Sequence, residues 1–141
     1  MTMVGLAVLV GTVLVATAVG LVLRARAGRV RAGRSTSAEW ARWGVDAGAG
    51  DRVLLLQLST PVCAPCRQAA VVLTDLAERH TGLRHVEIDI ADDPSPAVAL
   101  SVMRTPTIVA FDRAGRELLR VSGVPRTGEL ITALRPQLSP V

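Results

Sequence analysis

The only two cysteines of the chain stand three residues apart, at the end of an apolar run and the start of a helical pattern. Residues 53–58 (VLLLQL) predict a buried strand, and a short Ser-Thr-Pro turn follows them. Residues 63–80 repeat their apolar side chains at helical spacing. Cys63 is therefore expected at a helix N-terminus, with Cys66 about one turn further in and within disulfide reach.

This placement favours thiol–disulfide chemistry. The free N–H groups and the dipole of a helix N-terminus stabilise a thiolate at Cys63, and the thiolate is the attacking species. Pro65 falls in the first turn, where a missing N–H is tolerated. Two other interpretations stay open: a structural pair of small apolar residues, and a zinc site. Zinc needs four ligands, and the chain adds only His80 and His85 as nitrogen donors, so we expect no metal.

Residues 3–23 carry no charge and no proline. As a helix they reach about 31 Å, enough to cross a hydrocarbon core of about 30 Å. A cleaved signal peptide is the alternative, since Ala16-Thr17-Ala18 resembles a cleavage site. The absence of a basic segment before the run, its continuation through Leu23 and the arginines after it favour an uncleaved transmembrane anchor over residues 1–23.

Five arginines follow this span before the next acidic residue, and no charged side chain precedes it. Positive flanks stay cytoplasmic, so we expect a single-pass protein of the cell membrane whose soluble part faces the cytoplasm, with lipid as a partner. The extracytoplasmic orientation is the alternative.

Residues 24–50 are expected to form a juxtamembrane linker without a packed element over 24–36, and residues 51–141 are expected to form the domain. A short helix over 37–43 is expected to dock on the domain through Trp40 and Trp43, or else to lie at the membrane interface.

The formal charge of +4 belongs to the linker rather than to the domain. Residues 35–141 carry 11 arginines and 12 acidic residues, a net charge of −1. Without a broad basic face, binding to nucleic acid is not expected. The chain also has no phosphate-binding loop and no dinucleotide fingerprint, so no organic cofactor is implied.

The elements after residue 52 alternate between strand and helix patterns. We expect strands over 53–58, 84–90, 107–111 and 116–122, and helices over 63–80, 94–103 and 126–138. This order predicts an α/β fold, a mixed sheet with helices on both faces.

From about residue 52 to 138 the chain resembles the thioredoxins. The anchors of the resemblance are Cys63-Ala64-Pro65-Cys66 and, forty residues later, Thr105-Pro106-Thr107, together with the order of elements. The resemblance implies a thioredoxin-like fold in which Pro106 is cis and lies beside the two cysteines. It also implies that the backbone of Thr105 pairs with an extended substrate segment.

Three positions depart from the usual thioredoxin pattern. Val62 replaces a tryptophan, Ala64 replaces a glycine, and Gln57 replaces a buried aspartate that moves a proton at the second cysteine. His85 aligns with a lysine near that acid and is a candidate to replace it in part. The carboxylates Glu87, Asp89, Asp92 and Asp93 are interpreted as a solvated strand end and the charge before the next helix.

The predicted function is membrane-anchored reduction of protein disulfides by Cys63 and Cys66. The partners would be disulfide-bearing client proteins and, as electron donor, a dithiol protein or a low-molecular-weight thiol. Two alternatives remain: a thioredoxin-fold binding module without turnover, and an envelope-facing protein of disulfide or cytochrome maturation.

Overall fold

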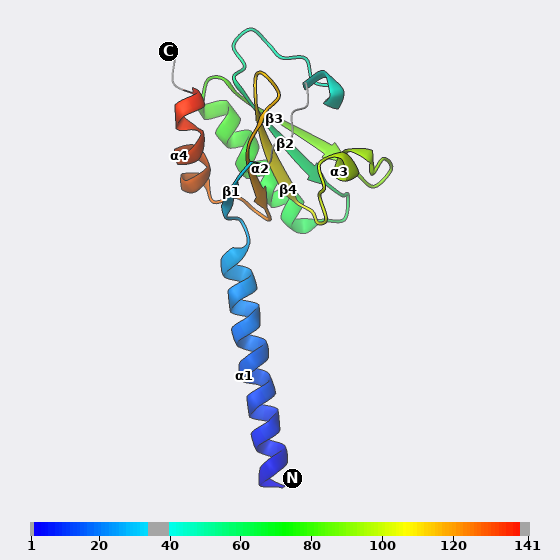
Figure 1. Ribbon diagram of the computed structural model, residues 1–141, viewed down its shortest axis with the longest axis vertical. Coiled ribbons are helices and arrows are strands. Elements are labelled where there is room, and N and C mark those ends of the chain that lie inside the picture. The colour runs from blue at the N-terminus through cyan, green and yellow to red at the C-terminus, as the bar shows by residue number, and fades with distance from the viewer. Residues whose placement is uncertain (1, 34–39, 139–141) are drawn as a thin grey trace.

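The computed structural model describes residues 2–33 and 40–138. Helix α1 (Met3–Arg26) projects away from the rest of the chain, and none of its residues is buried (Figure 1). In the described chain it is the one helix long and apolar enough to cross a membrane, a property that a signal sequence near an N-terminus shares.

The remaining elements surround a five-stranded sheet in the order β1-β5-β4-β2-β3. Only β2 and β3 pair in parallel, and the other neighbours are antiparallel. The sheet is therefore mixed, as predicted. Its strands are β1 (Val30–Ala32), β2 (Val53–Ser59), β3 (Leu83–Asp89), β4 (Thr107–Asp112) and β5 (Glu117–Ser122).

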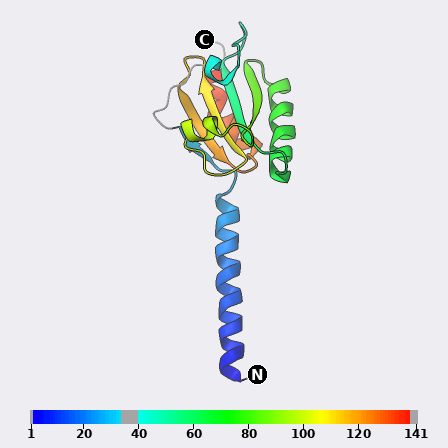
Figure 2. The same ribbon diagram turned by 90° about the vertical axis from the view of Figure 1, so that its right-hand side faces the viewer.

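Helices cover both faces of this sheet (Figures 1 and 2). On one face α2 (Ala64–Arg79) and α4 (Thr127–Leu138) pack through Leu73, Leu130 and Leu134 against the sheet. On the other face lie α3 (Ser95–Ala99) and the 3-10 helix η1 (Trp40–Trp43). The structure thus confirms a thioredoxin-like α/β fold.

Strand β2 is buried along its whole length, which explains its nearly continuous apolar sequence. Its side chains alternate between the two cores: Val53 and Leu55 face α2, whereas Leu54, Leu56 and Leu58 face the other side. By the same alternation, Gln57 and Ser59 continue the side that faces α2. The side of β2 that faces α2 therefore becomes polar as the strand approaches the cysteines.

The expectation that residues 24–36 hold no packed element was wrong. Helix α1 continues to Arg26, and Val30–Ala32 forms strand β1, paired with Val121, Arg120 and Leu119 of β5. An edge strand of three residues needs main-chain pairing on one side and little apolar periodicity, so the sequence pattern gave no sign of it. The division at residue 51 between linker and domain stays a prediction.

The helix expected over 94–103 is shorter and spans only Ser95–Ala99. Ser101 has φ +52°, a left-handed conformation that ends the helix.

The segment around residues 40–43 docks on the domain, as the favoured interpretation held. Trp40 is buried and donates from Nε1 to the carbonyl oxygen of Asp112 at 2.7 Å, and the rings of Trp43 and Phe111 stack. Residues 37–39 of the expected helix lie outside the described residues.

Candidate active site

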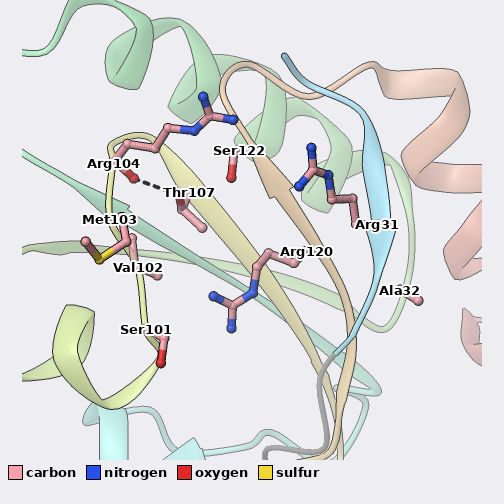
Figure 3. Close-up of a pocket in the computed structure, with 9 residues that line it drawn as sticks. All are labelled: Arg31, Ala32, Ser101, Val102, Met103, Arg104, Thr107, Arg120 and Ser122. Carbon is pink, nitrogen blue, oxygen red and sulfur yellow. Dashed lines mark hydrogen bonds between the residues drawn. The ribbon is translucent and has the colours of Figure 1, made fainter. Parts of the chain in front are cut away.

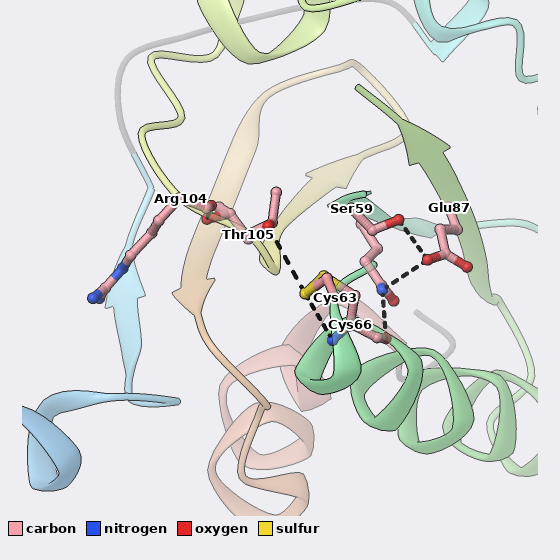
Figure 4. Close-up of a disulfide and its surroundings, with 8 residues drawn as sticks. Ser59, Cys63, Cys66, Glu87, Arg104 and Thr105 are labelled. Atoms are coloured by element: carbon pink, nitrogen blue, oxygen red, sulfur yellow. Dashed lines mark hydrogen bonds between the residues drawn. A yellow bond between two sulfur atoms is a disulfide. The ribbon is translucent and has the colours of Figure 1, made fainter. Parts of the chain in front are cut away.

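Cys63 and Cys66 form a disulfide at the start of α2, with a Cα–Cα distance of 5.2 Å (Figure 4). The turn after β2 delivers Cys63 to the N-cap position of the helix, where its backbone is extended. The N–H of Cys66 donates to the Cys63 sulfur at 3.2 Å. Pro65 lies in the first turn, as predicted. When the disulfide opens, a thiolate at Cys63 therefore keeps a backbone donor and the positive end of the helix dipole.

The two cysteines differ in access. Cys66 is only 1% exposed, whereas Cys63 is half-buried. The neighbouring Val62 is 93% exposed, so the approach to Cys63 is open on that side. An incoming sulfur can reach Cys63 far more easily than Cys66.

The loop before β4 brings the second motif to the disulfide. The Thr105–Pro106 peptide bond is cis, and the Thr105 hydroxyl donates to the Cys63 sulfur at 3.8 Å. The carbonyl oxygen of Pro106 accepts from the N–H of Gly123 at 2.8 Å, which ties the loop to the end of β5. Within the described residues, the backbone N–H and C=O of Thr105 have no hydrogen-bond partner. The binding roles of Thr105 and Pro106 stay predictions.

A buried amide lies directly beneath Cys66. Gln57 is fully buried, and its Nε2 donates to the carbonyl oxygen of Cys66 at 2.9 Å and to Oε1 of Glu87 at 3.2 Å. The same carboxylate oxygen accepts from the Ser59 hydroxyl at 2.5 Å (Figure 4). Gln57 thus joins the backbone of the buried cysteine to a carboxylate.

His85 holds the other end of this amide. Its Nε2 lies 3.0 Å from Oε1 of Gln57, and its Nδ1 lies 3.3 Å from the Thr74 hydroxyl. Burial lowers the pKa of His85 below its usual value, although the nearby Glu87 opposes the shift. A neutral ring with its proton on Nε2 satisfies both contacts, because it donates to Gln57 and accepts from Thr74. His85 therefore orients Gln57, and its predicted part in proton transfer stays a prediction.

Glu87 is the residue that the sequence interpretation missed, since it was assigned to a solvated strand end. The parallel register places Glu87 beside Gln57 and His85 beside Leu55. His85 and Glu87 thus both lie on the α2 side of the sheet, and their alternation in sequence was the available signal. Glu87 also shares with Cys66 and Ser59 an open pocket of about 370 Å³.

This arrangement provides the groups that thiol–disulfide exchange requires: an accessible sulfur at a helix N-terminus, a buried partner sulfur, and a carboxylate in the pocket of the buried one. A metal site has less support. Over residues 2–33 and 40–138, no three His, Cys, Asp or Glu side chains are grouped to hold a metal ion.

Comparisons of sequence agree with this geometry. Among curated proteins, the chain is 37% identical over 75 residues to NADPH-dependent thioredoxin reductase 3 of Arabidopsis thaliana, covering 52% of this chain and 14% of that protein. It is 29% identical over 92 residues to the putative thioredoxin H10 of the same plant, covering 65% of this chain and 58% of the relative. The chain thus spans less than two thirds of the length of these two relatives.

Solved structures give the same result. The chain matches a mutant thioredoxin from Halobacterium salinarum at 26% identity and a TM-score of 0.57, covering 64% of this chain and 79% of that one. The thioredoxin of Fasciola hepatica is 24% identical with a TM-score of 0.54, over 62% and 83% of the two chains, and supports the fold. A sequence model of the Thioredoxin family matches residues 37–135, which include both cysteines and the cis-proline loop. The chain therefore belongs to the thioredoxin family.

Proposed function

We propose that this protein is a membrane-anchored thiol–disulfide oxidoreductase that reduces disulfides of client proteins. The observation that carries the proposal is the Cys63–Cys66 disulfide at the N-terminus of α2, with the Thr105 hydroxyl on the Cys63 sulfur. The accessible sulfur, the helix N-terminus and the adjacent loop with unpaired backbone groups together suit attack on an extended substrate.

The reaction transfers two electrons in two exchanges. The Cys63 thiolate attacks a client disulfide, bonds to one client sulfur and releases the other as a thiolate. Cys66 then loses its proton and attacks the Cys63 sulfur, which releases the second client thiolate and closes the Cys63–Cys66 disulfide. The client is reduced and the protein is oxidised. A dithiol protein or a low-molecular-weight thiol restores the dithiol form.

Glu87 is the proposed acceptor of the Cys66 proton. Gln57 occupies the position under Cys66 but has no titratable group, and the contacts of His85 are with Gln57 and Thr74. Glu87 lines the same pocket as Cys66, and the proposed route for the proton is a water molecule in that pocket.

A binding module without turnover is the competing function, and the buried Gln57 is the observation that favours it. Such a module would hold a client without exchanging disulfides. The two functions differ in whether a covalent bond to a client forms.

Replacing Cys66 with Ser should convert the protein into a trap for its clients. The first exchange proceeds at Cys63, but no thiol remains to resolve the mixed disulfide. We expect client adducts, released by reductant, that non-reducing electrophoresis resolves and mass spectrometry identifies. The double variant Cys63→Ser/Cys66→Ser is the matched control and should form none. A Cys66→Ser protein without adducts, in cells where it is produced and folded, would favour the binding module.

We also propose that α1 anchors the protein with its domain in the cytoplasm. Support comes from its length of 24 residues and from the arginines that follow its apolar part, because positively charged flanks stay on the cytoplasmic side of a membrane. A fluorescent protein that folds only in the cytoplasm, fused after Val141, should therefore be fluorescent. Alkaline phosphatase, which is active only outside the cytoplasm, should be inactive at the same position. High phosphatase activity would instead assign the same two cysteines to envelope disulfide or cytochrome maturation.

A further inference from the structure

The connection between α1 and the sheet is short and hydrogen-bonded. Only residues 27–29 separate Arg26 from Val30, which allows these two Cα atoms to lie about 14 Å apart at most. The N–H of Gly28 donates to the carbonyl oxygen of Ser122 at 2.7 Å, and Arg126 donates from Nη2 to the carbonyl oxygen of Ala25 at 3.2 Å. The end of α1 is therefore held against the junction between β5 and α4.

Gly28 shows how closely the two segments approach. Its φ is +72°, and a Cβ at this position would lie 2.2 Å from the carbonyl oxygen of Val124. A side chain at residue 28 would push the anchor away from the domain. With β1 paired to β5 immediately afterwards, the domain has little freedom to turn relative to α1.

The same junction borders the redox site. The N–H of Gly123, which follows Ser122, donates to the carbonyl oxygen of Pro106 at 2.8 Å. The residue before Pro106 is Thr105, whose hydroxyl contacts the Cys63 sulfur. In both views, the N-terminal end of α2 lies at the end of the domain from which α1 emerges, whereas the turn between β4 and β5 lies at the opposite end (Figures 1 and 2).

The length of α1 brings this end of the domain close to the bilayer. Its 24 residues reach about 36 Å, against about 30 Å of hydrocarbon, so only about one turn projects into the headgroup layer. The three-residue connection adds little height. With α1 spanning a membrane as proposed above, the end of the domain that holds Cys63 and Cys66, the redox end, would lie within the interfacial layer.

The side chains at this end suit such a position. Val62 and Met103, on the two loops beside the disulfide, are 93% and 95% exposed. Arg31 of β1 and Arg104 of the cis-proline loop lie on either side of Ser122 in an open pocket of about 240 Å³ (Figure 3). Within the described chain, neither guanidinium has an ion-pair partner. Exposed apolar groups and unpaired arginines both favour the membrane–water interface.

We propose that the redox end of the domain faces the bilayer, and that its substrates are disulfides of membrane-embedded proteins located at the membrane surface. The proposal rests on the anchored thiol–disulfide exchange proposed above. The electrons come from the same donor, a dithiol protein or a low-molecular-weight thiol. An extended client segment leaving the bilayer would pass between Val62 and Met103 and pair with the backbone of Thr105. A disulfide held far from the membrane would reach Cys63 less often, because the β1–β5 pairing leaves the domain little freedom to turn relative to α1.

Depth measurements on the full chain test the orientation without redox activity. In the Cys63→Ser/Cys66→Ser background, a fluorophore is attached at Met103→Cys or, as matched control, at the exposed Ala114→Cys in the β4–β5 turn. In phosphatidylcholine vesicles with headgroup-nitroxide lipid, the probe at position 103 should be quenched at least about threefold more. A 20-residue Gly/Ser insertion between Arg26 and Ala27 should remove most of this difference. Equal quenching, or stronger quenching at position 114, would overturn the proposal.

Activity measurements test the substrate class. Two synthetic peptides each contain one apolar span and one cystine ring. In the first, the near ring directly follows the span; in the second, a 30-residue helical spacer of about 45 Å separates the far ring from the span. The full chain in vesicles should reduce the near ring at least about tenfold faster, and the Gly/Ser insertion should bring the ratio close to one. Equal rates for near and far rings would contradict the proposal. Failure to reduce either ring would refute the proposed function instead, and the quenching would still decide whether the disulfide end of the domain faces the bilayer.

Discussion

Replacing Cys63 with Ser should reduce the catalysed reduction of insulin by dithiothreitol to the uncatalysed rate, a loss of about 100-fold or more. The reason is that the first exchange forms a covalent bond between Cys63 and a client sulfur. Cys66 cannot substitute for it, because Cys66 is only 1% exposed, within the first turn of α2. The turbidity of precipitating insulin chains measures the rate.

The serine variant also has a favourable control. Serine is a preferred N-cap residue, so the start of α2 should be retained, which circular dichroism can verify. Ala64→Ser changes the neighbouring position by one hydroxyl and should keep most of the activity. Equal rates for the natural chain and the Cys63→Ser variant would indicate a binding module.

Replacing Glu87 with Gln should slow the second exchange by about 100-fold at pH 7, the low end of the range for general acid–base catalysis. The variant keeps an oxygen for the Ser59 hydroxyl but loses the group that accepts the Cys66 proton. Formation of the mixed disulfide at Cys63 should be unchanged, since Glu87 has no contact with that sulfur within the described residues. Rapid-quench measurements with a labelled disulfide peptide separate the two steps.

The pH dependence distinguishes a proton acceptor from a merely structural side chain. Raising the pH favours loss of the Cys66 proton to solvent without an acceptor side chain, so the variant should recover part of its rate at alkaline pH. Glu78→Gln, on the exposed side of α2, is the control and should show no change. A pH-independent loss in Glu87→Gln, or no loss at pH 7, would contradict the role of Glu87.

Much of the domain could be predicted from the sequence, because its patterns were strong. The run from Val53 is apolar since both faces of β2 are covered, and the helical spacing after Cys63 reflects one buried face of α2. The resemblance to thioredoxins also implied that the second motif lies beside the cysteines: the Thr105–Pro106 bond is cis, and the Thr105 hydroxyl donates to the Cys63 sulfur.

The parts that could not be predicted depend on pairing between distant residues. Strand β1 exists because the backbone of Val30–Ala32 pairs with β5, and backbone pairing leaves little trace in side-chain patterns. Glu87 joins the site because β2 and β3 pair in parallel and in a register that sets it beside Gln57. The position of Glu87 on a strand was predictable from the sequence, whereas its neighbour Gln57 was not.

A redox titration of Cys63 and Cys66 in the full chain tests whether the pair exchanges disulfides reversibly. Dithiothreitol buffers of stepped potential set the equilibrium, thiol alkylation followed by mass measurement gives the reduced fraction, and circular dichroism follows the fold. For a reversible dithiol–disulfide site we expect a single two-electron transition, in which the ratio of reduced to oxidised protein changes tenfold for about each 30 mV. The domain should be folded in both the reduced and the oxidised form. A disulfide that stays closed until the domain unfolds would contradict an oxidoreductase and leave the pair a structural link.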